Sequence, residues 1–581
     1  MRRSTRRAIG LGLVAMIGVA AVGAQESDQP QATFFAPLNV PLVSIEVYAS
    51  DHSGRPMPGL TLEDFEIFED GKLVPISHFY AAPGLTEAAG ITEGTQEEVD
   101  PGDLLAESPP AQDLYLVIYF DDTNLNRGRR QSAIEYVGAF LASELPPDLK
   151  VMLVRYDGHL NIEQAFTEET DEVIAALDAT RASASLSRRI DETMLMREIE
   201  NAASVAAISS DPIQTLESSG RSIWQSIGSY VDQTVHRTRT GIENQKRMIG
   251  SLSGLSGRKA ILLVSDGVEP RPGEALYRAW SQTFGVVPAY RIDAQRSFLQ
   301  ASRNDLSSEF SDVARFANGH RVSFYTLSAA EMGSARAISA ETRRMDEARL
   351  AVEQGLSQEV LMANMAGVTG GRSLVNSPGL ADQLDEVSEE LASYYSLAFE
   401  PQHFGDGKYH RLEVKVKKDG VRVRHREGYL DVPLSERITD RTMAAAIHGV
   451  TDNPLGISVA TVGEIMARED GTFLVAVIIT VPIGQLVFIP SEEEHQGRIS
   501  INLMVRDRRG DLSAPIRREY PIAIPNAALT TALGQTAGFT MRLAVGPGRQ
   551  RVAVGVRDAI AQTESVTFLE IEAGDSDGMG G

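Results

Sequence analysis

The sequence contains no cysteine among its 581 residues. This absence excludes disulfide bonds, thiol catalysis and zinc sites built on cysteine, because each of them needs a thiol. It also excludes a lipid anchor on an N-terminal cysteine. The length exceeds what one ordinary core requires, so we expect about two to four domains.

Basic residues are scarce relative to acidic ones. The chain has 55 Lys and Arg against 79 Asp and Glu, a net charge of −24. This balance argues against nucleic acid as a partner, because phosphate binding needs a basic face. Also absent are the G-x-S-x-G elbow, the H-E-x-x-H zinc motif and the Walker loop. We therefore expect a protein that is not an enzyme.

The N-terminal residues 1–24 have the pattern of an export signal. An apolar stretch from Ala8 to Val22 is followed by the small residues Gly23 and Ala24, which suit cleavage before Gln25. The pattern predicts a periplasmic, secreted or cell-surface protein that does not span the membrane after cleavage. Both general secretion and twin-arginine export remain open, because the basic start consists of Arg2, Arg3, Arg6 and Arg7.

Two apolar runs end in acidic residues. Leu114 to Phe120 is followed by Asp121 and Asp122, and Lys259 to Val264 is followed by Ser265-Asp266-Gly267. Runs of this kind predict strands buried on both faces, as in a parallel sheet. Because ligand crevices of open α/β sheets lie at the carboxyl ends of the strands, the acidic residues are candidates for a site.

These two stretches resemble the von Willebrand factor A pattern, in which a strand ends in D-x-S-x-S and a later strand ends in (T/S)-D-G. The chain is more closely similar to bacterial secreted VWFA-related proteins. The resemblance covers roughly residues 38–432, and it is carried by the stretches GRPMPGLTLEDFEIFEDGK, GRKAILLVSDG, MAGVTGGRSL and SYYSLAFEP, followed by GKYHRLEVKV and VRHREGY.

The resemblance implies a divalent cation, Mg²⁺ or Ca²⁺, that a carboxylate of a protein partner completes. Thr193 is the only counterpart that we can suggest for the family's middle threonine. The first motif departs from the family because amides stand where hydroxyls are expected. The implied ligands are Asp122, Asn124, Asn126 and Asp266, with Asp121 or Thr123 as alternates if the strand ends one residue earlier.

A different interpretation of the same residues needs no metal. Arg127, Arg129 and Arg130 follow the first motif directly. An arginine that folds back would neutralise the aspartates and take the place of the cation. In that case Asp121 or Asp122 caps the next helix and pairs with these arginines. Both interpretations stay open at this point.

The order of predicted elements gives an α/β fold class with added β domains. We predict a doubly wound, mostly parallel vWA (Rossmann-like) sheet inserted in a split β-sandwich, followed by an all-β immunoglobulin-like domain. The predicted parts are a signal peptide at 1–24, sandwich halves at 38–82 and 393–432, a linker at 83–112, the vWA-like domain at 113–392 and the last domain at 436–575.

Three segments carry secondary predictions. Residues 181–256 are expected as a helical excursion, and residues 269–320 as a polar, loop-rich connection. Residues 473–490 are apolar enough to suggest a membrane span, but β-branched residues and a central proline favour two strands joined by a turn. His410 and His425 fall on neighbouring strands, where we expect them on the sheet surface.

Two functions follow from these expectations. In the first, the protein is an extracytoplasmic binding or adhesion module whose crevice recognises a protein partner, with or without a cation. In the second, it is a structural or assembly component of the bacterial envelope, with a degenerate vWA scaffold and contacts made by the terminal domain. Fold alone does not separate the two.

Overall fold

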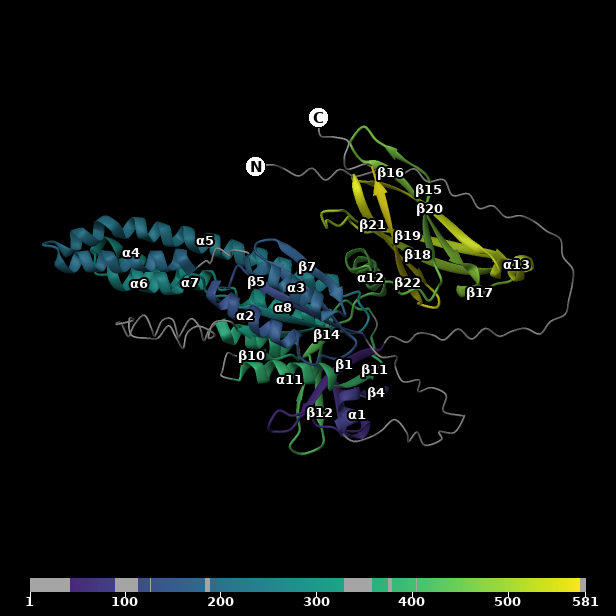
Figure 1. The fold of residues 1–581 in the computed structure, drawn as a ribbon, viewed down its shortest axis with the longest axis horizontal. Helices are drawn as coiled ribbons and strands as arrows, with labels where there is room; N and C mark the ends of the chain where they lie inside the picture. The colour runs from purple at the N-terminus through teal and green to yellow at the C-terminus, as the bar shows by residue number, and fades with distance from the viewer. Residues whose placement is uncertain are drawn as a thin grey trace. The chain divides into compact units, whose positions relative to one another are not determined.

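The computed structural model describes residues 42–88, 113–125, 127–182, 189–328, 358–374, 379–403 and 405–574. They form two compact units, which meet in sequence between Val432 and Pro433. The fold is mixed α/β, with one mainly parallel sheet and several antiparallel sheets, which confirms the predicted class at that level (Figure 1). The expected signal peptide, most of the expected linker and Asn126 lie outside the described residues. Within the described ranges, no helix has the length and apolar character needed to cross a bilayer.

A six-stranded sheet forms the centre of the first unit. Its strand order is β10-β9-β8-β5-β6-β7, and every neighbouring pair is parallel except β6 and β7. The two strands predicted from apolar runs are therefore adjacent in the middle of the sheet. The strands are β5 (Leu114–Asp121), β6 (Leu149–Tyr156), β7 (Leu160–Thr167), β8 (Arg258–Ser265), β9 (Val322–Ser328) and β10 (Ser373–Leu374).

Helices cover both faces of this sheet. On one face, α2 (Arg127–Leu141), α3 (Thr170–Ala179) and α11 (Leu380–Ala392) share a core with alternate residues of the strands. On the other face lie α5 (Pro212–Leu252), α8 (Ser307–Gly319) and a helix over residues 358–368. Because both faces are covered, the central strand β5 is apolar from Leu114 to Phe120, as its sequence predicted.

A group of long helices extends beyond the sheet (Figure 1). Within the predicted excursion at 181–256, most described residues lie in α4 (Arg189–Ile208) and α5, as expected. α5 packs against both α4 and α6 (Glu274–Phe284). The prediction of a loop-rich connection at 269–320 is wrong, because the segment holds α6, α7 (Arg291–Arg303) and α8. The helices were missed because their buried aromatic residues are widely spaced among polar ones. These aromatic residues include Trp280 and Phe284, which are buried against α5.

Two antiparallel four-stranded sheets enclose a second core in the first unit. Their orders are β13-β1-β11-β4 and β14-β12-β2-β3, so segments before and after the parallel sheet pair with one another. The expected linker begins with the short helix α1 (Pro83–Ala88). The strands are β1 (Val43–Ser50), β2 (Phe65–Glu69), β3 (Lys72–Val74), β4 (His78–Ala81), β11 (Tyr395–Phe399), β12 (Tyr409–Val416), β13 (Arg422–Arg424) and β14 (Gly428–Leu430).

The second unit consists of two antiparallel sheets with a shared apolar core. It begins with a helix, α12 (Leu434–His448), which the all-β expectation missed, as it missed strand β15. The two strands and the turn expected within residues 473–490 are present, but the second strand is only the two residues of β17, because a 3-10 turn (Ile483–Gln485) and an irregular stretch follow β16. The strands are β15 (Ser458–Ala467), β16 (Phe473–Pro482), β17 (Ile489–Pro490), β18 (Glu494–Arg506), β19 (Ile516–Pro525), β20 (Thr536–Val545), β21 (Gly548–Asp558) and β22 (Glu564–Ala573), with α13 (Leu529–Leu533) before β20.

Candidate functional site

The carboxyl ends of β5 and β8 meet at one edge of the parallel sheet. The strands pair in parallel with Phe120 opposite Val264. The backbone N–H of Asp266 donates to the carbonyl oxygen of Asn124 at 3.1 Å, so the two loops continue the contact beyond the strands. The structure therefore brings together the two acidic strand ends that the sequence predicted.

Asp121 and Asp122 point to opposite faces of the sheet. Successive side chains of a strand alternate, and Asp121 is the last residue of β5. Its carboxylate accepts hydrogen bonds from the Thr123 hydroxyl and the Asn124 amide, both at 2.6 Å, and from the Ser265 hydroxyl at 3.3 Å. Asp121 rather than Asp122 thus makes the side-chain contact with β8, as the alternate register allowed.

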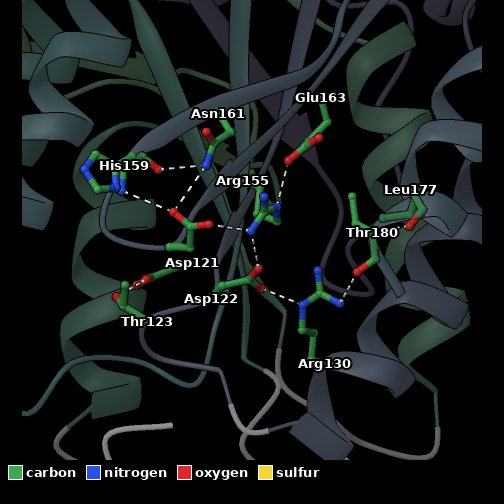
Figure 2. A network of polar contacts seen from close by, with 11 residues as sticks. Asp121, Asp122, Thr123, Arg130, Arg155, His159, Asn161, Glu163, Leu177 and Thr180 are labelled. Carbon is green, nitrogen blue, oxygen red and sulfur yellow. Dashed lines mark hydrogen bonds and ion pairs between the residues drawn. The ribbon is translucent and has the colours of Figure 1, made fainter. Parts of the chain in front are cut away.

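Asp122 lies on the α2 face between two guanidinium groups, as Figure 2 shows. Its Oδ1 is 2.6 Å from Nε of Arg130, and its Oδ2 is 3.6 Å from a terminal nitrogen of Arg155. Arg130 is held in place by the carbonyl oxygen of Thr180, to which it donates at 3.0 Å. Burial raises the pKa of Asp122 above its ordinary value, and the two arginines offset that effect only in part.

Asp266 has an arginine partner from the same helix. A terminal nitrogen of Arg129 lies 3.3 Å from its Oδ2. Arg129 and Arg130 are consecutive residues in the first turn of α2, so one helix start supplies a cation to each strand end. This pairing is the second interpretation of the sequence, in which arginines neutralise the aspartates.

The edge of the sheet is closed to solvent at these carboxylates. Asp121, Asp122 and Asp266 are all buried. The helix over residues 358–368 covers the Asp121 side, where an added Cβ on Gly267 would lie 2.8 Å from Cβ of Gln358. Gly267 has a φ of +84°, a conformation that favours glycine. Both this backbone conformation and the nearby Gln358 therefore require glycine at this position. Because their side chains are buried, the three aspartates cannot contact a partner protein in this conformation.

The donor set does not fit a hard divalent cation. Such an ion needs several oxygen ligands at about 2.0–2.6 Å, whereas the oxygens here face guanidinium, hydroxyl and amide donors. Thr193, the suggested counterpart of a threonine ligand, is exposed on α4, and Asn126 lies outside the described residues. Mg²⁺ or Ca²⁺ stays a prediction from the family resemblance.

A pocket of about 810 Å³ lies beside the closed edge. The loop after β8, α6, α8 and the helix over residues 358–368 form its walls. Its lining combines apolar side chains such as Phe310 and Leu361 with three arginines and three glutamates. The charged residues are Arg271, Arg278, Arg315, Glu269, Glu274 and Glu427. The pocket therefore offers a partly apolar surface with charges of both signs a short way from the strand ends.

Histidines of the antiparallel sheets depart from the sequence prediction. His410 is buried, not on the sheet surface, and its Nδ1 lies 2.9 Å from a carboxylate oxygen of Asp70. The Nε2 of His425 accepts the backbone N–H of Val414 at 3.1 Å, and burial lowers the pKa of His425. His403 was missed altogether. Its ring stacks on His410 with centroids 3.6 Å apart.

Comparisons with known proteins give no family. No protein-family model matches the chain, and no curated protein matches it. Among solved structures, it is similar to the conserved hypothetical protein BatB from Bacteroides thetaiotaomicron, with 11% identity over 48% of this chain and 98% of that one, at a TM-score of 0.19. The pilus adhesin SpaC from Lactobacillus rhamnosus GG is 6% identical over 80% of this chain and 66% of that one, at a TM-score of 0.22. Three N-terminal domains of the type V pili tip protein Mfa5 from Porphyromonas gingivalis are 10% identical, covering 89% of this chain and 78% of that one, at 0.22. At these scores the likenesses carry no argument about function.

Proposed function

We propose that the chain is an exported, non-enzymatic assembly component of the bacterial envelope, in which a von Willebrand factor A-like domain serves as a scaffold without a cation. The observation that carries the proposal is the pairing of Asp122 and Asp266 with Arg130 and Arg129. The residues that would bind a metal in the family pattern instead join two strand ends to one helix. Export is inferred from the pattern of residues 1–24.

The pairing favours a structural role because it removes the chemistry of a cation-dependent adhesion site. Such a site needs carboxylates that are open to a metal and to a partner. Here the carboxylates are buried and their charge is matched by guanidinium groups from within the same unit. An ion pair of this kind fixes the position of α2 against β5 and β8 and leaves no coordination site for a partner's carboxylate.

The C-terminal unit offers a surface through which assembly can occur. In the three-stranded sheet of that unit, β15 pairs only with β16, so one edge of this ten-residue strand is unpaired among the described residues. Val462 and Met466 are exposed on it. An unpaired edge carries free N–H and C=O groups that accept an added strand. The expected partner is therefore an extended segment of another envelope protein.

The experiment compares retention of envelope proteins by immobilised chains. Val462→Lys places a charge on the edge of β15 and should reduce retention at least several-fold, because charge on an edge opposes strand addition. The matched control is Leu73→Lys on β3, at a side chain that is also exposed, which should retain as much as the wild type. Retention should not change with a chelator. Equal retention by both variants, or loss of retention with chelator, would contradict the proposal.

A second candidate is partner binding beside the crevice, as in the binding or adhesion hypothesis. The observation that favours it is the pocket with Arg271, Arg278 and Arg315 in its lining. Its apolar side chains and its charges of both signs would suit a partner segment that carries apolar and charged side chains. In this case Arg278→Glu should abolish retention while Val462→Lys should not, so the same assay separates the two functions.

A further inference from the structure

Two stacked histidines in the antiparallel sheets lie inside a group of carboxylates. His403, in the loop between β11 and β12, has Glu69 at 3.2 Å from Nε2 and Asp431 at 3.1 Å from Nδ1. His410, on β12, has Asp70 and Asp406 at its two ring nitrogens. Every ring nitrogen of the pair thus faces a carboxylate oxygen.

Glu69 occupies the Nε2 side of the His403 ring. Glu69 is buried at the end of β2, and its Oε1 also accepts the hydroxyl of Tyr429 at 2.6 Å. This arrangement makes Glu69 an acceptor for an Nε2–H of His403. A neutral ring then presents its Nδ1 lone pair to Asp431, and two acceptors face each other at 3.1 Å. A metal cation bound by both atoms makes that contact favourable, as a second proton on the ring would also do.

The neighbourhood of Nδ1 supplies a set of ligands. One atom each from His403, Asp406 and Asp431 lie within 4.8 Å of one another. The separation of 3.1 Å between Nδ1 and Asp431 is close to the edge of a zinc tetrahedron, about 3.3 Å for bonds near 2.0–2.1 Å. Asp431 is buried, and Asp406 lies at the solvent-exposed side of the loop, where water can complete the shell and an ion can enter.

We propose that His403 Nδ1, Asp406 and Asp431 bind a divalent transition-metal ion, of which Zn²⁺ is the best fit, with Glu69 as the carboxylate that orients His403. A ligating histidine commonly donates its other N–H to a carboxylate, which fixes the tautomer and the ring. Here Tyr429 in turn fixes Glu69, and the ring of His410 stacks on that of His403 with 15° between their planes. Near-parallel rings cannot aim both lone pairs at one point, so His410 is excluded as a second ligand.

The ligand types select the ion. One imidazole and two carboxylates suit Zn²⁺, which takes nitrogen and oxygen ligands in a four-coordinate shell. Ca²⁺ and Mg²⁺ prefer shells made of oxygen alone. The ion would join His403 and Asp406 to Asp431, the residue after β14, and through Glu69 it would also hold the N-terminal strand β2. The site is separate from the strand ends of the parallel sheet and does not depend on the proposed function.

The test measures zinc bound to the whole chain, purified without a histidine tag. Elemental analysis after dialysis should give one zinc per chain, and calorimetry should give one site for Zn²⁺ and no comparable site for Ca²⁺ or Mg²⁺. His403→Gln and Asp431→Asn should lose this zinc. Glu69→Gln should keep one zinc per chain but bind it about 10–100-fold more weakly, because only the orientation of the ligand is lost.

Matched controls separate ligand loss from misfolding. His52→Gln and Asp419→Asn change exposed residues of the same β unit and should bind zinc as the wild type does. Asp406→Asn removes a carboxylate ligand at the exposed side and keeps an amide group beside Nε2 of the buried His410. Circular dichroism should show an unchanged fold while zinc is lost. Absence of stoichiometric zinc in the wild type, or equal binding by His403→Gln, would overturn the proposal and leave His403 as a doubly protonated ring between Glu69 and Asp431.

Discussion

Asp122 Oδ1 lies 2.6 Å from Nε of Arg130, and the two side chains are only 2% and 4% exposed. The pair joins the end of β5 to the start of α2 at the centre of the molecule's parallel sheet. Removing both charges from water costs free energy. The pair therefore offsets this cost only if its hydrogen-bond geometry is good. The predictions below follow from this balance and from the packing around it.

Arg130→Met should strongly destabilise the first unit. The variant leaves the Asp122 carboxylate buried with only Arg155 nearby, and breaking a buried pair in this way costs about 3–5 kcal/mol. The measurement is urea unfolding followed by tryptophan fluorescence. Trp224 and Trp280 are the only two tryptophans of the chain, and both lie in the first unit, so the signal reports on that unit.

Arg181→Ala is the matched control for this prediction. Arg181 pairs with Asp178 at 2.7 Å, but the two side chains are 36% and 54% exposed. Exposed pairs contribute about 0.2–1 kcal/mol at most, so the control should unfold close to the wild type. The double variant Asp122→Asn/Arg130→Met should recover much of the stability lost in Arg130→Met. Equal effects of the buried and exposed substitutions would contradict the assignment.

The pH dependence of stability should have an unusual sign at Asp122. Its pKa is raised on folding, mainly by burial, so the folded state holds the proton more tightly than the unfolded state. The contribution of this group to stability is therefore most favourable below the ordinary value of about 3.9 and falls as pH rises through the raised pKa. Measured from pH 4 to 7, the free energy of unfolding of the wild type should fall relative to Asp122→Asn.

Asp157, which also pairs with Arg155, should change the stability in the opposite direction with pH. Burial raises its pKa, but the N–H of His159 and the guanidinium of Arg155 together bring the pKa below its ordinary value. Its contribution to stability is present above the ordinary pKa and is lost as pH falls through the lowered one. The wild type should therefore gain stability relative to Asp157→Asn as pH rises through this acid range. The same slope for both variants would show that one of the two environments is wrongly described.

Two glycines of α5 should respond to alanine in opposite directions. An added Cβ on Gly220 would lie 2.5 Å from the ring of Tyr290, so Gly220→Ala should destabilise by about 1–3 kcal/mol through overpacking. Gly228 has no neighbour within 4 Å of such a Cβ, so Gly228→Ala should stabilise the helix by up to about 1 kcal/mol. Thermal unfolding of the two variants checks the predicted difference, and stabilisation by both would refute the packing of α5 on Tyr290.

The central strands could be predicted because their signal is local. Leu114 to Phe120 is an unbroken apolar run, and Lys259 is followed by another from Ala260 to Val264. The observed β5 is one residue longer than the predicted strand, and β8 is one residue longer at each end. The helices between residues 274 and 319 were not predicted, because their apolar residues are spaced among many polar ones. The same applies to α12, where a helix precedes a unit whose other apolar runs all indicated strands.

The candidate site shows a similar division. The sequence placed Asp122 and Asp266 at neighbouring strand ends, and it left two partners open, a cation or the following arginines. Whether a cation or an arginine pairs with the aspartates depends on the face of the sheet that the first turn of α2 covers. No local sequence pattern specifies this face. The cluster at His403 was not predicted because Glu69 and Asp431 are more than 300 residues apart in the sequence and meet only when β2, β12 and β14 pair.

Calorimetric titration of the purified chain with Mg²⁺ and with Ca²⁺ tests the central claim most directly. If arginines occupy the place of the cation, millimolar concentrations of either ion should produce no binding heat, and the thermal midpoint should not change between chelator and added ion. A saturable heat for either ion that disappears in Asp266→Asn but persists in His403→Gln would contradict the account, because it would place a metal at the strand ends of β5 and β8.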